Sequence, residues 1–95
     1  TTDELKAKIN NNETVQIVDL REDYEFEENN IGGVNIPLGD FLNSLEQIDT
    51  SKQVVLCCRT GKKSAAMTHT LERKLDLNNF YSLEGGVFRY LGIEA

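Results

Sequence analysis

The sequence contains only two cysteines, one histidine, no tryptophan and no long apolar run. The two cysteines, Cys57 and Cys58, are adjacent, and a disulfide between neighbours would strain the peptide that joins them. This argues against a secreted disulfide framework, and we expect a reducing compartment, the cytoplasm. The chain offers a single imidazole, His69, far from the two thiols and without the spacing of a zinc site. We therefore expect no metal and no cofactor, with His69 on the surface of a helix.

Segments that would direct the chain to or through a membrane are also missing. No apolar run approaches the roughly 18 residues that cross a bilayer, and no signal-peptide pattern opens the chain. Low-complexity stretches are absent too, and 39% of the residues are hydrophobic, which favours a folded globule. We expect one soluble domain over residues 1–95, with no membrane partner. Its polar start would suit a domain excised from a longer protein.

Positive charge is scarce in the first half of the chain. The formal net charge is −6; residues 1–51 carry −9 and residues 52–95 carry +3. Such an acidic protein is a poor candidate for nonspecific binding to nucleic acid, so we expect no nucleic-acid partner. The feature that needs explanation is a local basic group formed by Arg59, Lys62 and Lys63, which would otherwise be read as a solvated loop.

Strand-like and helix-like segments alternate along the whole chain. Apolar and β-branched runs predict strands over residues 15–18, 34–36, 54–57 and 80–83. Helical spacing predicts a helix capped by Thr2, one over residues 22–28, one from Asp40 onward, one after Gly61 and a short last one from Val87. Residues 54–57 are apolar throughout, as expected for a strand buried on both faces. The alternation predicts one α/β domain, with a parallel sheet covered by helices on both faces.

The loop after the buried strand 54–57 is the best candidate for a reactive site. In open α/β sheets, sites form beyond the carboxyl ends of the strands. A thiol at Cys58 would meet converging N–H groups, the positive end of a helix dipole and the basic group, all of which favour a thiolate. Gly61 allows a backbone turn with positive φ in this loop. The alternative interpretation is an inert cysteine at a strand end.

Two other anion-binding loops are excluded by spacing. A nucleotide-binding P-loop needs glycine at position 56 and serine or threonine at position 63, where this chain has Leu56 and Lys63. A protein-tyrosine-phosphatase loop places arginine six residues after the cysteine, and that position is Ser64.

Four ordered segments resemble the rhodanese superfamily. Residues 58–64, C-R-T-G-K-K-S, resemble its active-site loop C-R-S/T-G-x-R-S. Residues 18–22 resemble its early D-x-R-E segment, and residues 30–38 resemble its H-I-P-G-A-x-N-I-P segment. Residues 83–86, L-E-G-G, followed by Tyr90, resemble its L-E-G-G-x-x-x-W ending. The resemblance covers nearly the whole chain.

This resemblance implies a rhodanese fold, with a parallel five-stranded sheet flanked by helices, and a persulfide mechanism. Its sulfur donor would be a small sulfur-containing anion such as thiosulfate, or a protein persulfide; its acceptor would be cyanide, a thiol or a protein sulfur acceptor. Carried over by position, the nucleophile is Cys58, the substrate-binding residues are Arg59, Thr60, Gly61, Lys62, Lys63 and Ser64, and the supporting residues are Asp19 and Arg21. An ordinary surface ion pair is an equal alternative for Asp19 and Arg21.

The sequence departs from the family pattern at a few positions. Lys63 replaces the usual arginine, which keeps the charge but weakens two-point recognition of an anion. Asn30, Gly32 and Tyr90 replace a frequent histidine, proline and tryptophan. None of these changes removes a group that the chemistry requires.

Three other functions fit parts of the same pattern. A phosphatase or arsenate reductase related to the cell-cycle dual-specificity phosphatases would have a loop one residue longer. A rhodanese module used only for binding commonly lacks the cysteine that this chain retains. The chain could also be the C-terminal sulfur-relay domain of a sulfur-activating adenylating enzyme, and that alternative stays open.

Overall fold

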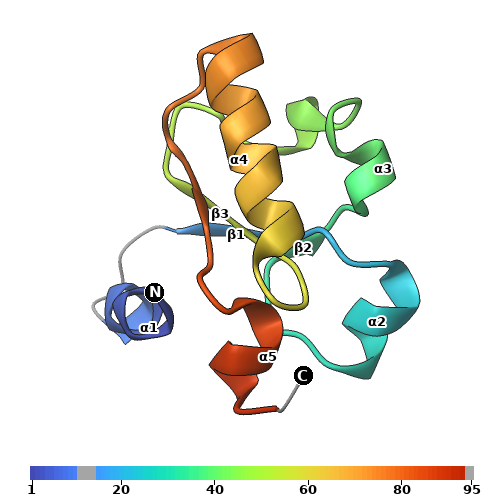
Figure 1. Ribbon diagram of the computed structural model, residues 1–95, viewed down its shortest axis with the longest axis vertical. Coiled ribbons are helices and arrows are strands. Elements are labelled where there is room, and N and C mark those ends of the chain that lie inside the picture. The colour runs from blue at the N-terminus through green and yellow to red at the C-terminus, as the bar shows by residue number, and fades with distance from the viewer. Residues whose placement is uncertain (11–14, 94–95) are drawn as a thin grey trace.

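Four parallel strands form the centre of the molecule (Figure 1). The computed structural model describes residues 1–10 and 15–93. Within these residues the sheet has the spatial order β2-β1-β3-β4. Its strands are β1 (Gln16–Asp19), β2 (Val34–Asn35), β3 (Val54–Cys57) and β4 (Phe80–Ser82). The predicted parallel α/β sheet is confirmed, although the described part of the chain contributes four strands where the resemblance implied five.

Helices cover both faces of this sheet, as predicted. They are α1 (Thr2–Asn10), α2 (Asp23–Glu28), α3 (Leu38–Phe41), the 3-10 turn η1 (Leu45–Gln47), α4 (Lys62–Leu75) and α5 (Gly86–Leu91). In Figure 1, α3 and α4 lie on one side of the strands, whereas α1 and α5 lie on the other. Among the described residues, no helix has the length and apolar character needed to cross a membrane.

The core divides into two layers because successive strand residues point to opposite faces. Val18 and Leu56 point toward α4, whereas Ile17 and Cys57 point toward α1 and α5. The larger layer consists of Val18, Leu20, Ile36, Phe41, Ile48, Val54, Leu56, Leu71 and Phe80. The smaller one consists of Leu5, Ile17, Cys57, Leu83 and Val87. Strand β3 is thus buried between two apolar layers, which agrees with its unbroken apolar sequence.

Two expected helices differ in detail from the structure. At the start of α1, Thr1 and not Thr2 provides the cap, because Thr1 Oγ1 accepts a 3.2 Å hydrogen bond from the Glu4 N–H. The run of three asparagines at residues 10–12 was expected to end this helix, and residues 11 and 12 lie outside the described part of the chain. The single helix expected from Asp40 is two short pieces, α3 and η1. Asn43 and Ser44 stand between them, and such residues favour turns over helix interiors.

Helices α2 and α4 each bury only part of their apolar side chains. In α2 the inward aromatic residue is Phe26, which is half-buried, because Tyr24 is 67% exposed. In α4, Leu71 is fully buried, whereas Leu75, one turn further along the helix, is 47% exposed. His69 lies on the exposed side of α4, as predicted. Only a narrow strip of α4 therefore holds the helix against the sheet.

Candidate functional site: a hydrogen-bonded cysteine loop

Cys58 lies where β3 ends and the chain turns into α4. It is 4% exposed. The turn closes at Gly61, which caps α4 with a φ of 100°, a left-handed conformation that glycine adopts without steric cost. Helix α4 starts at Lys62, so Ser64 is its third residue and not its first. The loop 58–61 lies at the carboxyl end of the sheet, as predicted.

The Cys58 sulfur lies among hydrogen-bond donors. Its Sγ accepts bonds from the Gly61 N–H at 3.1 Å and from the Ser64 N–H at 3.4 Å, and it lies 3.5 Å from Ser64 Oγ. Burial is the largest influence on this thiol and acts to raise its pKa. The Ser64 hydroxyl and the N–H groups of Ser64, Gly61 and Lys63 together outweigh burial, so the pKa of Cys58 lies below its ordinary value. The site therefore favours a thiolate.

The cationic side chains of the loop form no hydrogen bond to the sulfur among the described contacts. Arg59, Lys62 and Lys63 are all exposed, whereas the groups that lower the pKa of Cys58 are hydrogen-bond donors. The Arg59 guanidinium lies 4.7 Å from the centre of the Phe88 ring, in cation–π contact with α5. From the sequence we expected backbone N–H groups and cations to favour the thiolate together. In the structure the N–H groups and the Ser64 hydroxyl stabilise it, and the cations border the entrance of the cleft.

A cleft of about 480 Å3 opens directly above Cys58. One wall is the cysteine loop and the start of α4; the facing wall comes from the segments after β1 and before α3. The lining residues are Leu20, Arg21, Glu22, Glu25, Leu38, Gly39, Cys58, Arg59, Thr60, Lys62 and Lys63. Of the predicted substrate-binding residues, Arg59, Thr60, Lys62 and Lys63 face this cleft, while Gly61 and Ser64 support the sulfur from behind.

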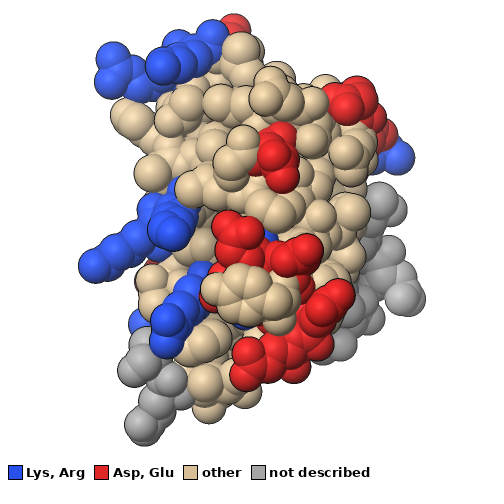
Figure 2. Space-filling view, turned by 90° about the vertical axis from the view of Figure 1, so that its right-hand side faces the viewer, with Lys and Arg blue, Asp and Glu red and all other residues tan. Residues whose placement is uncertain are grey.

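The wall that faces the basic residues is acidic. Glu22 and Glu25 line it, and they cap α2 by hydrogen bonds to each other's backbone N–H groups. The acidic side chains of this segment are Glu22, Asp23, Glu25, Glu27 and Glu28. Figure 2 shows acidic side chains gathered beside basic ones on this face of the molecule. The cleft thus carries both signs of charge, a feature that the predicted basic group alone did not indicate.

Asp19 and Arg21 form a buried ion pair beside the cysteine loop. Arg21 Nε lies 3.1 and 3.2 Å from the two carboxylate oxygens of Asp19, and Nη2 lies 3.0 Å from Oδ2. Asp19 is 0% and Arg21 6% exposed, so this is no surface pair. Burial acts to lower the pKa of Arg21, but the hydrogen bonds and charge of Asp19 raise it overall. Arg21 stays cationic and lines the cleft, while Asp19 lies beneath it.

The last helix supports the loop from the other side. The Val87 N–H donates to the Cys58 carbonyl at 2.9 Å, and the Phe88 N–H donates to the Arg59 carbonyl at 3.2 Å. A Cβ at Gly86 would fall on these two carbonyl oxygens, so only glycine allows α5 to approach so closely. Residues 83–86 were identified from the sequence only as a segment that resembles the family, with no role at the site. The glycine pair was the signal for this close contact.

Cys57 contrasts with its neighbour. Its side chain is 0% exposed in the smaller core layer. Burial is the main cause that raises the pKa of the Cys57 thiol, and the negative charge of Asp19 adds to it. A thiol that is buried and protonated is a poor nucleophile. Of the two cysteines, only Cys58 faces the cleft.

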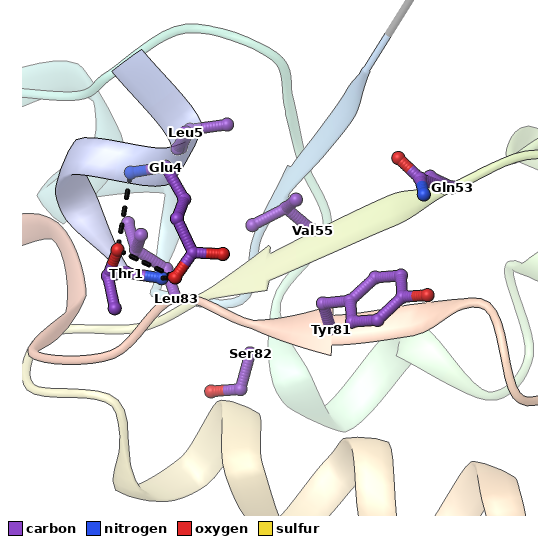
Figure 3. Close-up of a pocket in the computed structure, with 8 residues that line it drawn as sticks. All are labelled: Thr1, Glu4, Leu5, Gln53, Val55, Tyr81, Ser82 and Leu83. Atoms are coloured by element: carbon purple, nitrogen blue, oxygen red, sulfur yellow. Dashed lines mark hydrogen bonds and ion pairs between the residues drawn. The ribbon is translucent and has the colours of Figure 1, made fainter. Parts of the chain in front are cut away.

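A second hollow, of about 330 Å3, lies between α1 and the strands β3 and β4 (Figure 3). It is lined by Thr1, Glu4, Leu5, Gln53, Val55, Tyr81, Ser82 and Leu83. These residues include neither cysteine and none of the predicted site residues. Within the described residues, no three side chains of His, Cys, Asp or Glu gather in a way that could hold a metal ion. The cleft above Cys58 is therefore the candidate site.

The chain is similar to known proteins in both sequence and structure. The chain is 34% identical over 95 residues to the Bacillus subtilis protein named "Putative sulfurtransferase YtwF", which covers 97% of this chain and 88% of that protein. A rhodanese-like domain protein from Staphylococcus aureus has a similar structure, with a TM-score of 0.82, 30% identity, and coverage of 99% and 90% of the two chains. SSP1007 from Staphylococcus saprophyticus gives the same TM-score and identity and covers 99% and 95%.

A family model also matches almost the whole chain. Residues 1–92 match the family model described as "Rhodanese-like domain". This range includes all the strands, the cysteine loop and the α5 segment that supports it. Fold, loop and relatives thus agree, and the chain belongs to the rhodanese-like domain family.

Proposed function

We propose that this protein is a sulfurtransferase that carries a sulfane sulfur as a persulfide on Cys58. The observation that carries the proposal is the set of contacts around Cys58 Sγ: hydrogen bonds from the N–H groups of Gly61 and Ser64, and the Ser64 hydroxyl oxygen 3.5 Å away. A binding module has no use for a nearly buried thiolate that faces a cleft. The general class agrees with the name of the Bacillus subtilis relative.

The proposed reaction has two balanced steps. In the first, the Cys58 thiolate attacks the outer sulfur of thiosulfate; a bond forms between the two sulfurs, and sulfite leaves with the electron pair of the broken bond. In the second, cyanide or a thiolate attacks the outer sulfur of the persulfide and takes it away, and the electron pair returns to Cys58 Sγ. Cys58 Sγ is the nucleophile in the first step and the leaving group in the second. A thiolate with a lowered pKa suits both roles.

The loop would stabilise the negative charge that Cys58 Sγ carries before and after sulfur transfer. The N–H groups of Gly61 and Ser64 hold negative charge on Sγ at the start and end of each cycle. The basic residues at the entrance, Arg59, Lys62 and Lys63, would attract an anionic donor. Glu22 and Glu25 on the facing wall would oppose that attraction. A protein persulfide, which does not depend on a strongly positive cleft, is therefore as suitable a donor as thiosulfate.

The proposed chemistry needs a compartment that keeps thiols reduced. The reaction requires Cys58 to return to the free thiolate, and both cysteines are free in the structure. We place the protein in a reducing compartment such as the cytoplasm. Its partners would be a sulfane-sulfur donor and a thiol or protein sulfur acceptor.

Intact mass spectrometry after incubation with thiosulfate tests the proposal. The wild-type protein should gain one sulfur atom, and addition of cyanide should remove it with release of thiocyanate. Cys58→Ser should gain no sulfur, whereas Cys57→Ser should be loaded like the wild type. Loading that survives Cys58→Ser, or is lost only in Cys57→Ser, would show that the assignment is wrong.

A further inference from the structure

A second serine lies behind the cysteine loop. Ser82, the last residue of β4, has its Oγ 2.6 Å from Ser64 Oγ and 3.4 Å from the Gly61 carbonyl oxygen. A separation of 2.6 Å is at the short end of the range for hydrogen bonds between hydroxyls. Figure 3 shows the Ser82 hydroxyl on the side of β4 that faces a helix, away from Tyr81. The contact therefore joins the edge strand to the first turn of α4.

The Ser64 hydroxyl has one proton and several places to donate it. Its Oγ lies 3.5 Å from Cys58 Sγ, 3.2 Å from the Gly61 carbonyl oxygen and 2.6 Å from Ser82 Oγ. If the proton goes to Ser82 or to Gly61, the Cys58 thiolate loses a donor. The Gly61 carbonyl already accepts a 3.0 Å bond from the Ala65 N–H, which makes it the weaker competitor. The direction of the hydrogen bond between the two serines therefore decides whether the Ser64 hydroxyl can donate to Cys58 Sγ.

We propose that Ser82 is a positioning residue whose hydroxyl donates to Ser64 Oγ and so directs the Ser64 proton onto the Cys58 thiolate. When Cys58 is a neutral thiol, the chain reverses: its S–H donates to Ser64 Oγ, the Ser64 hydroxyl donates to Ser82 Oγ, and the Ser82 hydroxyl donates to the Gly61 carbonyl. A chain of hydrogen bonds that ends on an anion is polarised along its length, so each member strengthens the next. The inference rests on the proposed function, in which the thiolate of Cys58 is the nucleophile.

Ser82 can be changed without altering the charges around the sulfur. The titratable or charged side chains near Cys58 come from β1, the segment after it, α2, β3, the cysteine loop and α4. They are Asp19, Arg21, Glu22, Glu25, Cys57, Arg59, Lys62 and Lys63. Ser82 forms no hydrogen bond with any of these side chains among the contacts of the described residues. A variant at position 82 thus isolates the hydroxyl chain from the electrostatics of the cleft.

The test compares Ser82→Thr with Ser82→Val, two side chains of nearly equal shape of which only threonine has a hydroxyl. Both suit a strand, and Ser82→Ala serves as a smaller second variant without the hydroxyl. The measurement is the rate of Cys58 alkylation by iodoacetamide as a function of pH, followed by intact mass. We expect Ser82→Val and Ser82→Ala to raise the midpoint by about 0.5–1 pH unit, and Ser82→Thr to keep the wild-type midpoint.

Two results would overturn the proposal. An unchanged midpoint in both Ser82→Val and Ser82→Ala would show that the hydroxyl does not serve the sulfur, even if their melting temperatures fall. An equal rise in Ser82→Thr and Ser82→Val would show an effect of shape alone. Alkylation requires no sulfur donor, so this readout is independent of sulfur loading. If thiosulfate never loads Cys58 yet the midpoints separate as expected, the proposed function fails while the role of Ser82 stands.

Discussion

Asp19 and Arg21 are two residues apart in β1 and its continuation, yet their side chains meet in a two-point ion pair with both groups buried. Breaking such a pair by removing one partner leaves an uncompensated charge and costs about 3–5 kcal/mol. We predict that Asp19→Asn, which keeps the shape but removes the charge, lowers the free energy of unfolding by about 3 kcal/mol in urea titrations.

The same variant distinguishes support of the loop from participation in the reaction. Neither Asp19 nor Arg21 forms a hydrogen bond to Cys58 Sγ among the described contacts. At a temperature where it is folded, Asp19→Asn should therefore load sulfur, although more slowly than the wild type. Asp40→Asn, which changes an exposed carboxylate, is the matched control and should unfold like the wild type. Complete loss of loading in folded Asp19→Asn would make the carboxylate a direct participant.

The pKa of Cys58 should appear as an early midpoint in its alkylation by iodoacetamide. Hydrogen bonds from Ser64, Gly61 and Lys63 lower this pKa against the effect of burial. We expect the midpoint of the rate against pH to lie below that of a free thiol, which is about 8.5. Ser64→Ala, which removes the hydroxyl but keeps the N–H, should move the midpoint upward. A midpoint at or above the free-thiol value in the wild type would contradict the description of the loop.

Cys57 and Cys58 should affect the free energy of unfolding in opposite directions as pH rises. Folding lowers the pKa of Cys58, so its contribution is present above the unfolded pKa and is lost as pH falls through the folded pKa. Folding raises the pKa of Cys57, so its contribution is present below the unfolded pKa and is lost as pH rises above it. As pH rises toward and past the ordinary thiol pKa, Cys57→Ser should gain stability relative to the wild type, while Cys58→Ser should lose it. Urea midpoints in steps between neutral and alkaline pH would show whether the two differences diverge.

Gly86 is predicted to be the least replaceable glycine near the site. Alanine there would have a φ of 69° and a Cβ pressed onto the carbonyl oxygens of Cys58 and Arg59. We expect Gly86→Ala to cost about 3 kcal/mol or more and to slow sulfur loading, because α5 must move away from the loop. Gly92 is a matched control, with a φ of 73° and open space around its Cβ position. Gly92→Ala should cost about 1–2 kcal/mol and leave loading unchanged. Equal effects of the two changes would show that the close approach of α5 is unimportant.

Lys63 should limit the use of thiosulfate. Lysine offers a compact charge where an arginine could bind two oxygens of one anion. We expect Lys63→Arg to lower the KM for thiosulfate by about five- to thirty-fold, the equivalent of one charge-assisted hydrogen bond. Lys62 and Lys63 both line the cleft, so the alanine variants of each, measured at low and high salt, provide the comparison. Equal losses in both, with no gain from arginine, would mean that the two lysines supply only positive potential.

The sequence predicted best those features that depend on neighbouring residues. An unbroken apolar run predicted β3 with its observed ends, and a glycine with positive φ was expected at position 61. The position of Cys58 at the end of a buried strand followed from these two features. Helix α4 was predicted for the same reason, since its apolar stripe lies within one segment.

Features that depend on distant segments could not be predicted in this way. Ser82 and Ser64 are 18 residues apart, and nothing in the local pattern of either places their oxygens together. Burial of the Asp19–Arg21 pair was likewise left undecided, because the spacing of two charges shows nothing about what covers them. The helix expected from Asp40 broke at Asn43 and Ser44, where local turn preference and the burial of Phe41 replaced the helical pattern.

The contacts of α5 with the cysteine loop have a consequence for how the protein is made. The Val87 and Phe88 N–H groups that bind the carbonyls of Cys58 and Arg59 come much later in the chain than the loop itself. A ribosome that has released Cys58 but not yet Val87 therefore holds a thiol in an unfinished loop, with the reactivity of a cysteine in an ordinary peptide. The loop around Cys58 is complete only when α5 has packed against it. Because these two bonds close the loop from outside, we expect the loop to reach its folded geometry only after the end of the domain has been made.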